Sequence, residues 1–194
     1  FFNLCRAKKF YKKMIFFGSG AQYDKGRNLK KIKETDFGQS IPSDEYGFYK
    51  YICCEYIEKT ENIVCLTLFG LYGKHEDYKF KFISNAIVKN LLKQEIVINQ
   101  NVIFDYLFIE DLMLILDYFI LNKPKFKNYN IASDQPIDLI TICNIINEIS
   151  DYKSKITVLN NGLNKEYTAD NSRLRNEVPD LKFTSYKQGI GKLF

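Results

Sequence analysis

Apolar residues recur along the chain in two patterns: short continuous runs and longer stretches at helical spacing. Continuous runs are typical of strands buried on both faces, and the spaced stretches are typical of amphipathic helices. The runs predict strands at 14–17, 63–69, 96–98, 129–131 and 156–159. The spaced stretches predict helices at 1–13, 46–60, 80–92, 110–121 and 137–150. Alternation of strands and helices predicts an α/β fold with a parallel sheet.

A polar stretch at 24–45 separates the first strand from the second helix. It contains Gly26, Gly38 and Pro42, which favour turns over regular structure. A connection of this length is often functional, so we expect a loop over the site.

Tyr46 and Lys50 stand four positions apart at the start of the 46–60 helix, so their side chains share one face. A free tyrosine has a pKa of about 10 and is a poor base unless a nearby cation favours the phenolate. Lys50 is positioned to be that cation. Ser19 ends the first strand, where its hydroxyl would face the same region. The chain has 14 Tyr and many Lys, so the spacing alone also occurs on solvated helix faces.

The order of the surrounding segments makes the pair informative. Ser19 lies in GSGAQY and is followed by the Tyr-x-x-x-Lys helix, and four further segments come later: FGLYG at 69–73, FDYLFIED at 104–111, YNIAS at 129–133 and ADNSRL at 169–174. This order resembles the C-terminal half of an extended short-chain dehydrogenase/reductase. The subgroup it resembles is the NAD-dependent epimerase/dehydratase family, which acts on nucleotide sugars.

The resemblance implies part of a Rossmann-like parallel sheet with helices, plus a smaller α/β substrate-binding lobe interleaved in sequence. The sheet would be formed by 1–73 and 104–135, and the substrate lobe by 74–103 and 136–194. It implies that Tyr46 is the acid/base for a sugar hydroxyl, that Lys50 assists it and binds the cofactor ribose, and that Ser19 holds the substrate oxygen. NAD or NADP would also contact Phe69, Gly70 and Leu71, and a nucleotide-sugar substrate would also contact Gly20, Tyr23, Asn85 and Asp105.

The sequence departs from the family in three places. Phe104 and Thr67 stand where the family often has arginines that contact the substrate phosphates. No strand is followed by a G-x-x-G-x-x-G turn, since Gly18 and Gly20 are followed by Tyr at position 23. We therefore expect this chain to be a fragment that begins near the fifth helix of the family. Dehydratases carry Asp-Glu where this chain has Gly20-Ala21, which leaves an epimerase or a keto-reductase.

Composition limits the remaining classes. A hydrophobic content of 46% predicts a folded core, and the net charge of +5 comes from lysines that are spread along the chain apart from 30–33, so we expect no nucleic-acid partner. His75 is the single histidine and the five cysteines lack metal-ligand spacing, which predicts no metal site. The sequence has no run of about 18 apolar residues and no leader pattern, which predicts a cytoplasmic protein with reduced thiols and no membrane segment.

Two hypotheses follow from the sequence. The first is an NAD(P)-dependent nucleotide-sugar epimerase or keto-reductase, and the second is a catalytically silent substrate-binding or scaffold homologue without cofactor. Relatives often dimerise through the Tyr-x-x-x-Lys helix, so helices 1–13 and 46–60 are the expected surface of a homodimer.

Overall fold

The computed structural model describes residues 1–194, and one of its sheets consists of three parallel strands. Their order is β1 (Met14–Ser19), β3 (Ile63–Leu68) and β8 (Asn128–Ile131). The register pairs Ser19 with Leu68 and Leu68 with Ile131, so all three strands end at one edge. In a parallel α/β sheet this carboxyl edge is where ligands bind.

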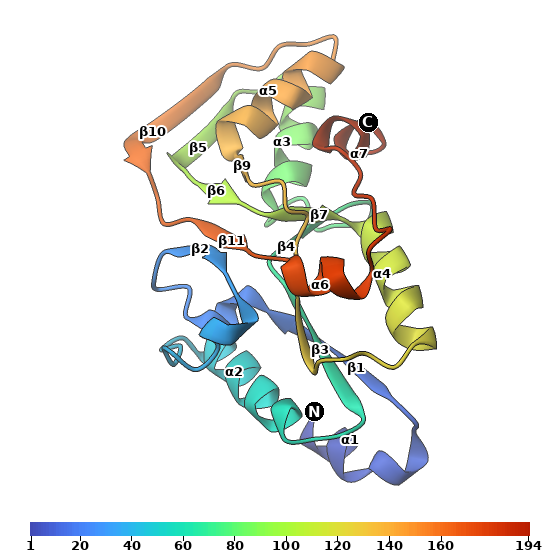
Figure 1. Cartoon of the computed structure of the whole chain (residues 1–194). Helices are drawn as coiled ribbons and strands as arrows, with labels where there is room; N and C mark the ends of the chain where they lie inside the picture. Colours follow the sequence, from blue (N-terminus) through green and yellow to red (C-terminus); the bar gives the residue numbers. More distant parts are fainter.

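Helices cover both faces of this sheet, with α2 (Glu45–Glu58) on one side and α4 (Ile109–Leu121) on the other (Figure 1). Side chains of β3 alternate between the two faces, as a strand requires. Cys65 packs in the cluster that contains the α2 residues, and Leu66 packs in the cluster that contains the α4 residues. The central strand is therefore apolar at every position except Thr67, because both of its faces are covered.

A second lobe is built around a pair of parallel strands, β5 (Ile96–Asn101) and β10 (Ile156–Leu163). It contains the helices α3 (Phe82–Leu91), α5 (Leu139–Ile149) and α7 (Tyr186–Gly191), which lie together at the upper end of the molecule (Figure 1). The buried residues of α5 recur at helical spacing and face the core of this lobe.

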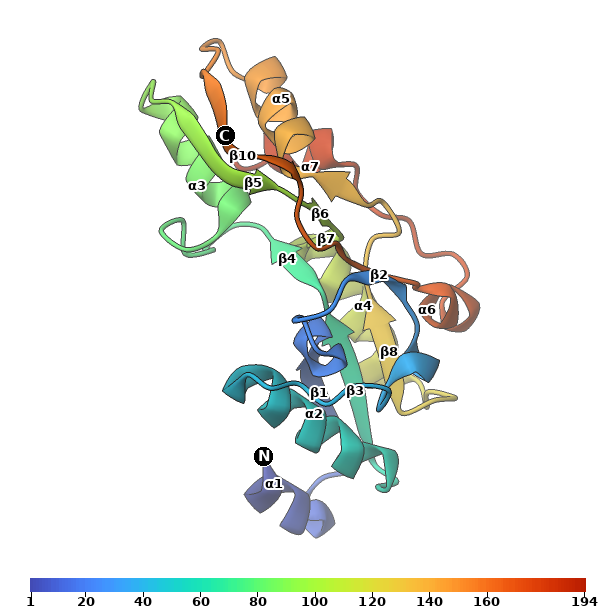
Figure 2. The ribbon, with the colours of Figure 1, turned by 90° about the vertical axis from the view of Figure 1, so that its left-hand side faces the viewer.

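Two small sheets join the lobes (Figure 2). In one, β4 (Gly70–Tyr72) pairs with β7 (Tyr106–Phe108) in parallel. The other runs in the order β2, β11, β6, β9 and brings together four segments that are far apart in the sequence. Their bounds are β2 Leu29–Ile32, β11 Tyr167–Ala169, β6 Ile103–Phe104 and β9 Ile137–Asp138.

The N-terminal helix is shorter than the sequence predicts. Helix α1 spans only Phe2–Arg6 and is followed by a 3₁₀ turn at Lys8–Phe10. Leu4 is 59% exposed, so it does not pack against the rest of the protein as an apolar helix residue would. A helix of this length is marginal without a packed apolar face, which is why the regular hydrogen bonding stops early.

The connection at 24–45 is more ordered than the expected loop. Besides β2 it contains a 3₁₀ turn at Glu34–Asp36, and a further 3₁₀ turn at Gly20–Tyr23 precedes it. Leu29 and Ile32 are buried whereas the two lysines between them are exposed. The backbone φ of Lys31 is 46°, which disturbs the alternation of buried and exposed side chains along β2. The sequence therefore lacks the alternating apolar pattern that would predict this strand.

The C-terminal segment returns to the three-stranded sheet. Helix α6 (Ser172–Glu177) places Leu174 in the cluster of α4 and β3, and Leu181 joins the same cluster. The sequence had assigned the whole of 136–194 to the second lobe, so this part of the segment lies elsewhere than expected. None of the helices combines the length and apolar character needed to cross a bilayer.

Candidate active site

Ser19 lies at the carboxyl edge of β1, where the chain turns into the 3₁₀ segment at Gly20–Tyr23. Its Oγ accepts a hydrogen bond from the backbone N of Ala21 at 3.3 Å, and the side chain is buried. All four residues of the 3₁₀ segment are also buried. The serine hydroxyl is therefore held at the sheet edge with its proton still available to a partner.

Helix α2 begins beside this serine segment. The Asp44 side chain accepts a hydrogen bond from the backbone N of Gly47 at 3.0 Å and caps the helix. A methyl group on Gly47 would lie 2.8 Å from the carbonyl O of Ala21 and 2.8 Å from Pro42 Cβ. Only a glycine allows so close an approach, which brings the first turn of α2 against the residues that follow Ser19.

Tyr46 and Lys50 share one face of α2, as the sequence predicts. Lys50 Nζ donates a hydrogen bond to the carbonyl O of Phe17 at 2.7 Å, and it lies 4.8 Å from the centre of the Phe16 ring and 5.6 Å from that of Tyr46. Tyr46 is 53% exposed. The ammonium is thus fixed to the strand that ends in Ser19, whereas the tyrosine is open to solvent.

Tyr167, which the sequence did not indicate, also belongs to this site. It comes from β11, and its hydroxyl O would lie 2.6 Å from a methyl group placed on Gly20. The centre of its ring is 5.2 Å from that of Phe69. Burial raises the pKa of Tyr167, while its contact with the Ser19 hydroxyl acts in the opposite direction. Its only sequence signal is that it precedes the ADNSRL segment, and nothing in the spacing links it to Ser19.

A cavity of about 520 Å³ opens beside Tyr167. Aromatic rings of Tyr167 and Phe104 line it, with Lys25 and Lys165 among the charged residues. Lys25 Nζ forms an ion pair with Asp44 Oδ1 at 3.1 Å, so the cavity also reaches the cap of α2. Its volume is within the range of small-molecule sites.

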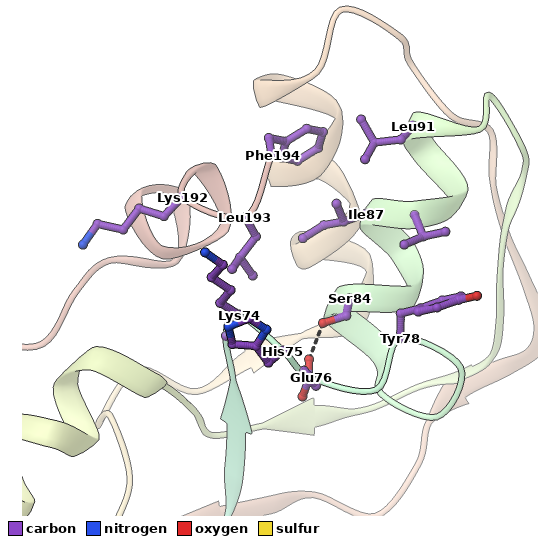
Figure 3. A pocket seen from close by; sticks show the side chains of 12 residues that line it. Lys74, His75, Glu76, Tyr78, Ser84, Ile87, Leu91, Lys192, Leu193 and Phe194 are labelled. Atoms are coloured by element: carbon purple, nitrogen blue, oxygen red, sulfur yellow. Dashed lines mark hydrogen bonds between the residues drawn. The ribbon is translucent and has the colours of Figure 1, made fainter.

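Another cavity, of about 430 Å³, lies between α3 and the C-terminal residues (Figure 3). His75 and Glu76 line it, and Ser84 Oγ donates a hydrogen bond to Glu76 Oε2 at 2.5 Å. Burial raises the pKa of Glu76. His75 is exposed, and none of Ser19, Tyr46 and Lys50 lines this cavity.

The sequence model of the NAD dependent epimerase/dehydratase family matches residues 2–132. The chain belongs to this family. The matched residues include Ser19, the Tyr-x-x-x-Lys helix and the Phe69–Gly73 turn. Only β9 and the elements after it lie outside the match.

A curated relative is ADP-L-glycero-D-manno-heptose-6-epimerase of Brachyspira hyodysenteriae, which is 24% identical over 208 residues. That alignment covers 98% of this chain and 64% of the relative. Among solved structures, UDP-N-acetylglucosamine 4-epimerase from Methanobrevibacter ruminantium has a TM-score of 0.80 at 21% identity, covering 98% of this chain and 65% of that one. UDP-glucuronic acid 4-epimerase from Bacillus cereus has a TM-score of 0.78 at 20% identity, with 97% and 65% covered. These structures share the fold, and the chain spans less than two thirds of the length of each relative.

The expected cofactor contacts lie at the start of β4 in this family member. Phe69 is buried, and its ring packs between those of Tyr23 and Tyr167. Gly70 and Leu71 pair with β7. The Phe69 ring therefore faces the interior, so any contact of residue 69 with a cofactor would come from its backbone.

Two of the expected substrate residues are buried and form hydrogen bonds within the protein. Tyr23 is buried, and its hydroxyl donates to Asn130 Oδ1 at 2.8 Å. Asp105 is fully buried, and its Oδ1 accepts hydrogen bonds from the backbone N and the hydroxyl of Ser133 at 2.9 and 2.8 Å. Burial raises the pKa of Asp105. Both residues hold the segments around the site together because their polar atoms point away from solvent.

The other two expected substrate residues are placed differently. Gly20 lies under Tyr167 at the serine segment, as described above. Asn85 is half-buried in the first turns of α3, where its Nδ2 donates to the carbonyl O of Tyr78 at 3.0 Å. No group of three or more His, Cys, Asp or Glu side chains is arranged to hold a metal ion.

Proposed function

We propose that this protein acts in the NAD(P)-dependent epimerisation or keto-reduction of a nucleotide sugar, with Tyr46 as the acid/base. The observation that carries the proposal is the close approach of Gly47 to Ala21, which brings the Tyr46–Lys50 face of α2 beside Ser19. Family membership supports the reaction class. The named activities of the heptose epimerase and the two UDP-sugar epimerases support a nucleotide-sugar substrate.

Each of the three side chains has a distinct part in this chemistry. Oxidation of a sugar alcohol releases a proton and a hydride. Tyr46 would take the proton, since its exposed side chain is open to a substrate and the Lys50 ammonium, 5.6 Å from its ring centre, favours the phenolate. Ser19 would hold the reacting oxygen at the sheet edge. Lys50 donates one of its three N–H groups to Phe17, so two remain for the tyrosine and a ribose hydroxyl.

The residues fit the nicotinamide end of NAD or NADP. Tyr46 and Lys50 would hold this end together with the backbone of 69–71, and the bound cofactor supplies the acceptor or donor of the hydride. The epimerase and dehydratase neighbours include complexes with NAD, which supports this cofactor class. The sequence contains no glycine-rich turn for the pyrophosphate, so the side-chain contacts that we propose for the cofactor are those of Tyr46 and Lys50.

The cavity beside Tyr167 is the proposed place of the nucleotide. Lys25 and Lys165 offer N–H donors to the diphosphate where Phe104 replaces an arginine, and Asp24 and Asp44 balance their charge. The rings of Phe104 and Tyr167, whose centres are 5.9 Å apart, offer apolar surface to a base or sugar.

The proposal is tested by Tyr46→Phe in the protein as its gene encodes it, with Tyr49→Phe as the matched control. Both tyrosines are about half exposed on the same helix, and the change removes one oxygen in each. The rate of nucleotide-sugar conversion, monitored by chromatography, should fall about 10²- to 10⁴-fold for Tyr46→Phe. Tyr49→Phe should retain the activity of the parent. Activity of Tyr46→Phe within a few-fold of the parent would exclude Tyr46 as the acid/base.

A further inference from the structure

A lysine-rich cavity of about 590 Å³ lies at the amino ends of β1, β3 and β8, the end of the sheet opposite to Ser19. Three segments that precede or begin these strands form its walls. Five lysines line it together with a single acidic residue, Glu61. The lysines are Lys12, Lys13, Lys123, Lys125 and Lys127.

Two of these lysines have a structural role at the ends of helices. Lys13 Nζ donates to the carbonyl O atoms of Phe119 at 2.7 Å and Asn122 at 2.5 Å, at the end of α4. Lys127 Nζ donates to the carbonyl O of Thr60, just after α2. Both ammonium groups therefore neutralise the negative ends of helix dipoles.

The other three lysines have no such explanation. Lys12, Lys123 and Lys125 form no hydrogen bond or ion pair through their side chains. Glu61 and the two helix ends, at about half a negative charge each, offset about two of the five positive charges. The cavity thus keeps about three uncompensated positive charges on a concave surface, where such charges act together on an anion.

A second lysine-lined cavity provides a contrast. It has a volume of about 350 Å³ and is lined by Lys30 and Lys31, but also by Asp138 and Glu166. Its side-chain charges are therefore balanced, although it lies in the densest run of lysines in the sequence. The abundance of lysine alone therefore does not produce excess positive charge. That excess is specific to the cavity at the amino ends of β1, β3 and β8.

We propose that the cavity lined by Lys12, Lys123 and Lys125 is a second ligand site that binds a polyphosphate group. Its volume suits a small molecule. Three free ammonium groups from two separate segments match a ligand with several negative charges better than a single phosphate. The site lies at the opposite end of the strands from Ser19, so it can be occupied together with the proposed active site.

The test is calorimetric titration of the chain with inorganic pyrophosphate at low and at high salt. The parent protein should bind one equivalent, with affinity that falls as salt rises. The variant Lys12→Gln/Lys123→Gln/Lys125→Gln should bind at least about tenfold more weakly, since each exposed charge contact contributes a small factor. Lys13 and Lys127 are left unchanged because they support α4 and α2.

The matched control is Lys30→Gln/Lys31→Gln/Lys33→Gln, which removes the same net charge at the other lysine run. It should bind pyrophosphate within about twofold of the parent. Absence of saturable binding, or equal weakening in the two variants, would overturn the proposal. A parallel titration with ADP identifies the source of the phosphates, judged on the part of the binding that the Lys12→Gln/Lys123→Gln/Lys125→Gln variant loses. If that part is tighter than for pyrophosphate, the ligand is a nucleotide; if it is equal, the site recognises the phosphate group alone.

Discussion

Replacement of Gly47 by alanine tests the close contact on which the candidate active site depends. The added methyl would lie 2.7 Å from Asp44 Oδ2, 2.8 Å from the carbonyl O of Ala21 and 2.8 Å from Pro42 Cβ. Ordinary contacts of this kind begin near 3.4 Å, and neither a backbone carbonyl nor a proline ring yields easily. Overpacking of this type costs about 1–3 kcal/mol. Alanine in a helix offsets about 0.5–1 kcal/mol of this because glycine is the weaker helix former.

The net loss in the free energy of unfolding is therefore about 0.5–2 kcal/mol, which for a chain of this size lowers Tm by roughly 1–8 °C. Gly191→Ala is the matched control, because Gly191 is also helical and has no atom within 4 Å of the added methyl. Thermal unfolding followed by circular dichroism should show Gly47→Ala below the parent and Gly191→Ala at or above it. A Tm for Gly47→Ala equal to that of Gly191→Ala would refute the close packing of α2 on the serine segment.

Three further predictions concern the site and its support. Tyr167→Phe removes the hydroxyl beside Ser19 and should lower turnover about 2- to 10-fold, the worth of one hydrogen bond, with Tm as the check on folding. Asp105→Asn should remove the dependence of folding stability on pH that this carboxyl causes. Burial raises the pKa of Asp105, so the free energy of unfolding of the parent, relative to that of the variant, should fall as pH rises above about 4. Denaturant unfolding at several pH values measures this difference. Calorimetry of the chain with NAD should show no saturation at micromolar levels, since no glycine-rich turn binds the pyrophosphate, and saturable binding would mean that another segment does so.

The strands and helices of the two lobes were predictable because their apolar patterns are long and regular. The helix expected at 46–60 is α2 at Glu45–Glu58, and the strand expected at 63–69 is β3 at Ile63–Leu68. The strands of two to four residues at the junction of the lobes were not predictable, because segments as short as Ile103–Phe104 contain too few residues to show a period.

The proximity of Ser19 to the Tyr46–Lys50 helix followed from motif order, whereas the role of Tyr167 did not. Tyr167 reaches Gly20 only because β11 pairs with β2 and β6, a tertiary arrangement that no local pattern encodes. The burial of Tyr23 and Asp105, which stay predicted substrate contacts, was not visible in the sequence for a related reason. A polar residue near a motif suggests a ligand contact when only the sequence is known. In the structure, Tyr23 and Asp105 form hydrogen bonds with Asn130 and Ser133, which come from a distant segment. The homodimer surface stays a prediction: α1 is short, although Tyr49, Ile52 and Tyr56 leave an exposed apolar side on α2.

The sheet that joins β2, β11, β6 and β9 also constrains the time course of biosynthesis. Leu29 pairs with Tyr167, so this sheet cannot close until residue 167 has left the ribosome. Contacts between residues so far apart in sequence also slow folding. Until then Leu29 and Ile32, which are buried in the folded protein, remain exposed to solvent in the nascent chain. The nascent chain would therefore carry a preformed serine segment and α2 well before Tyr167 arrives to complete the candidate active site.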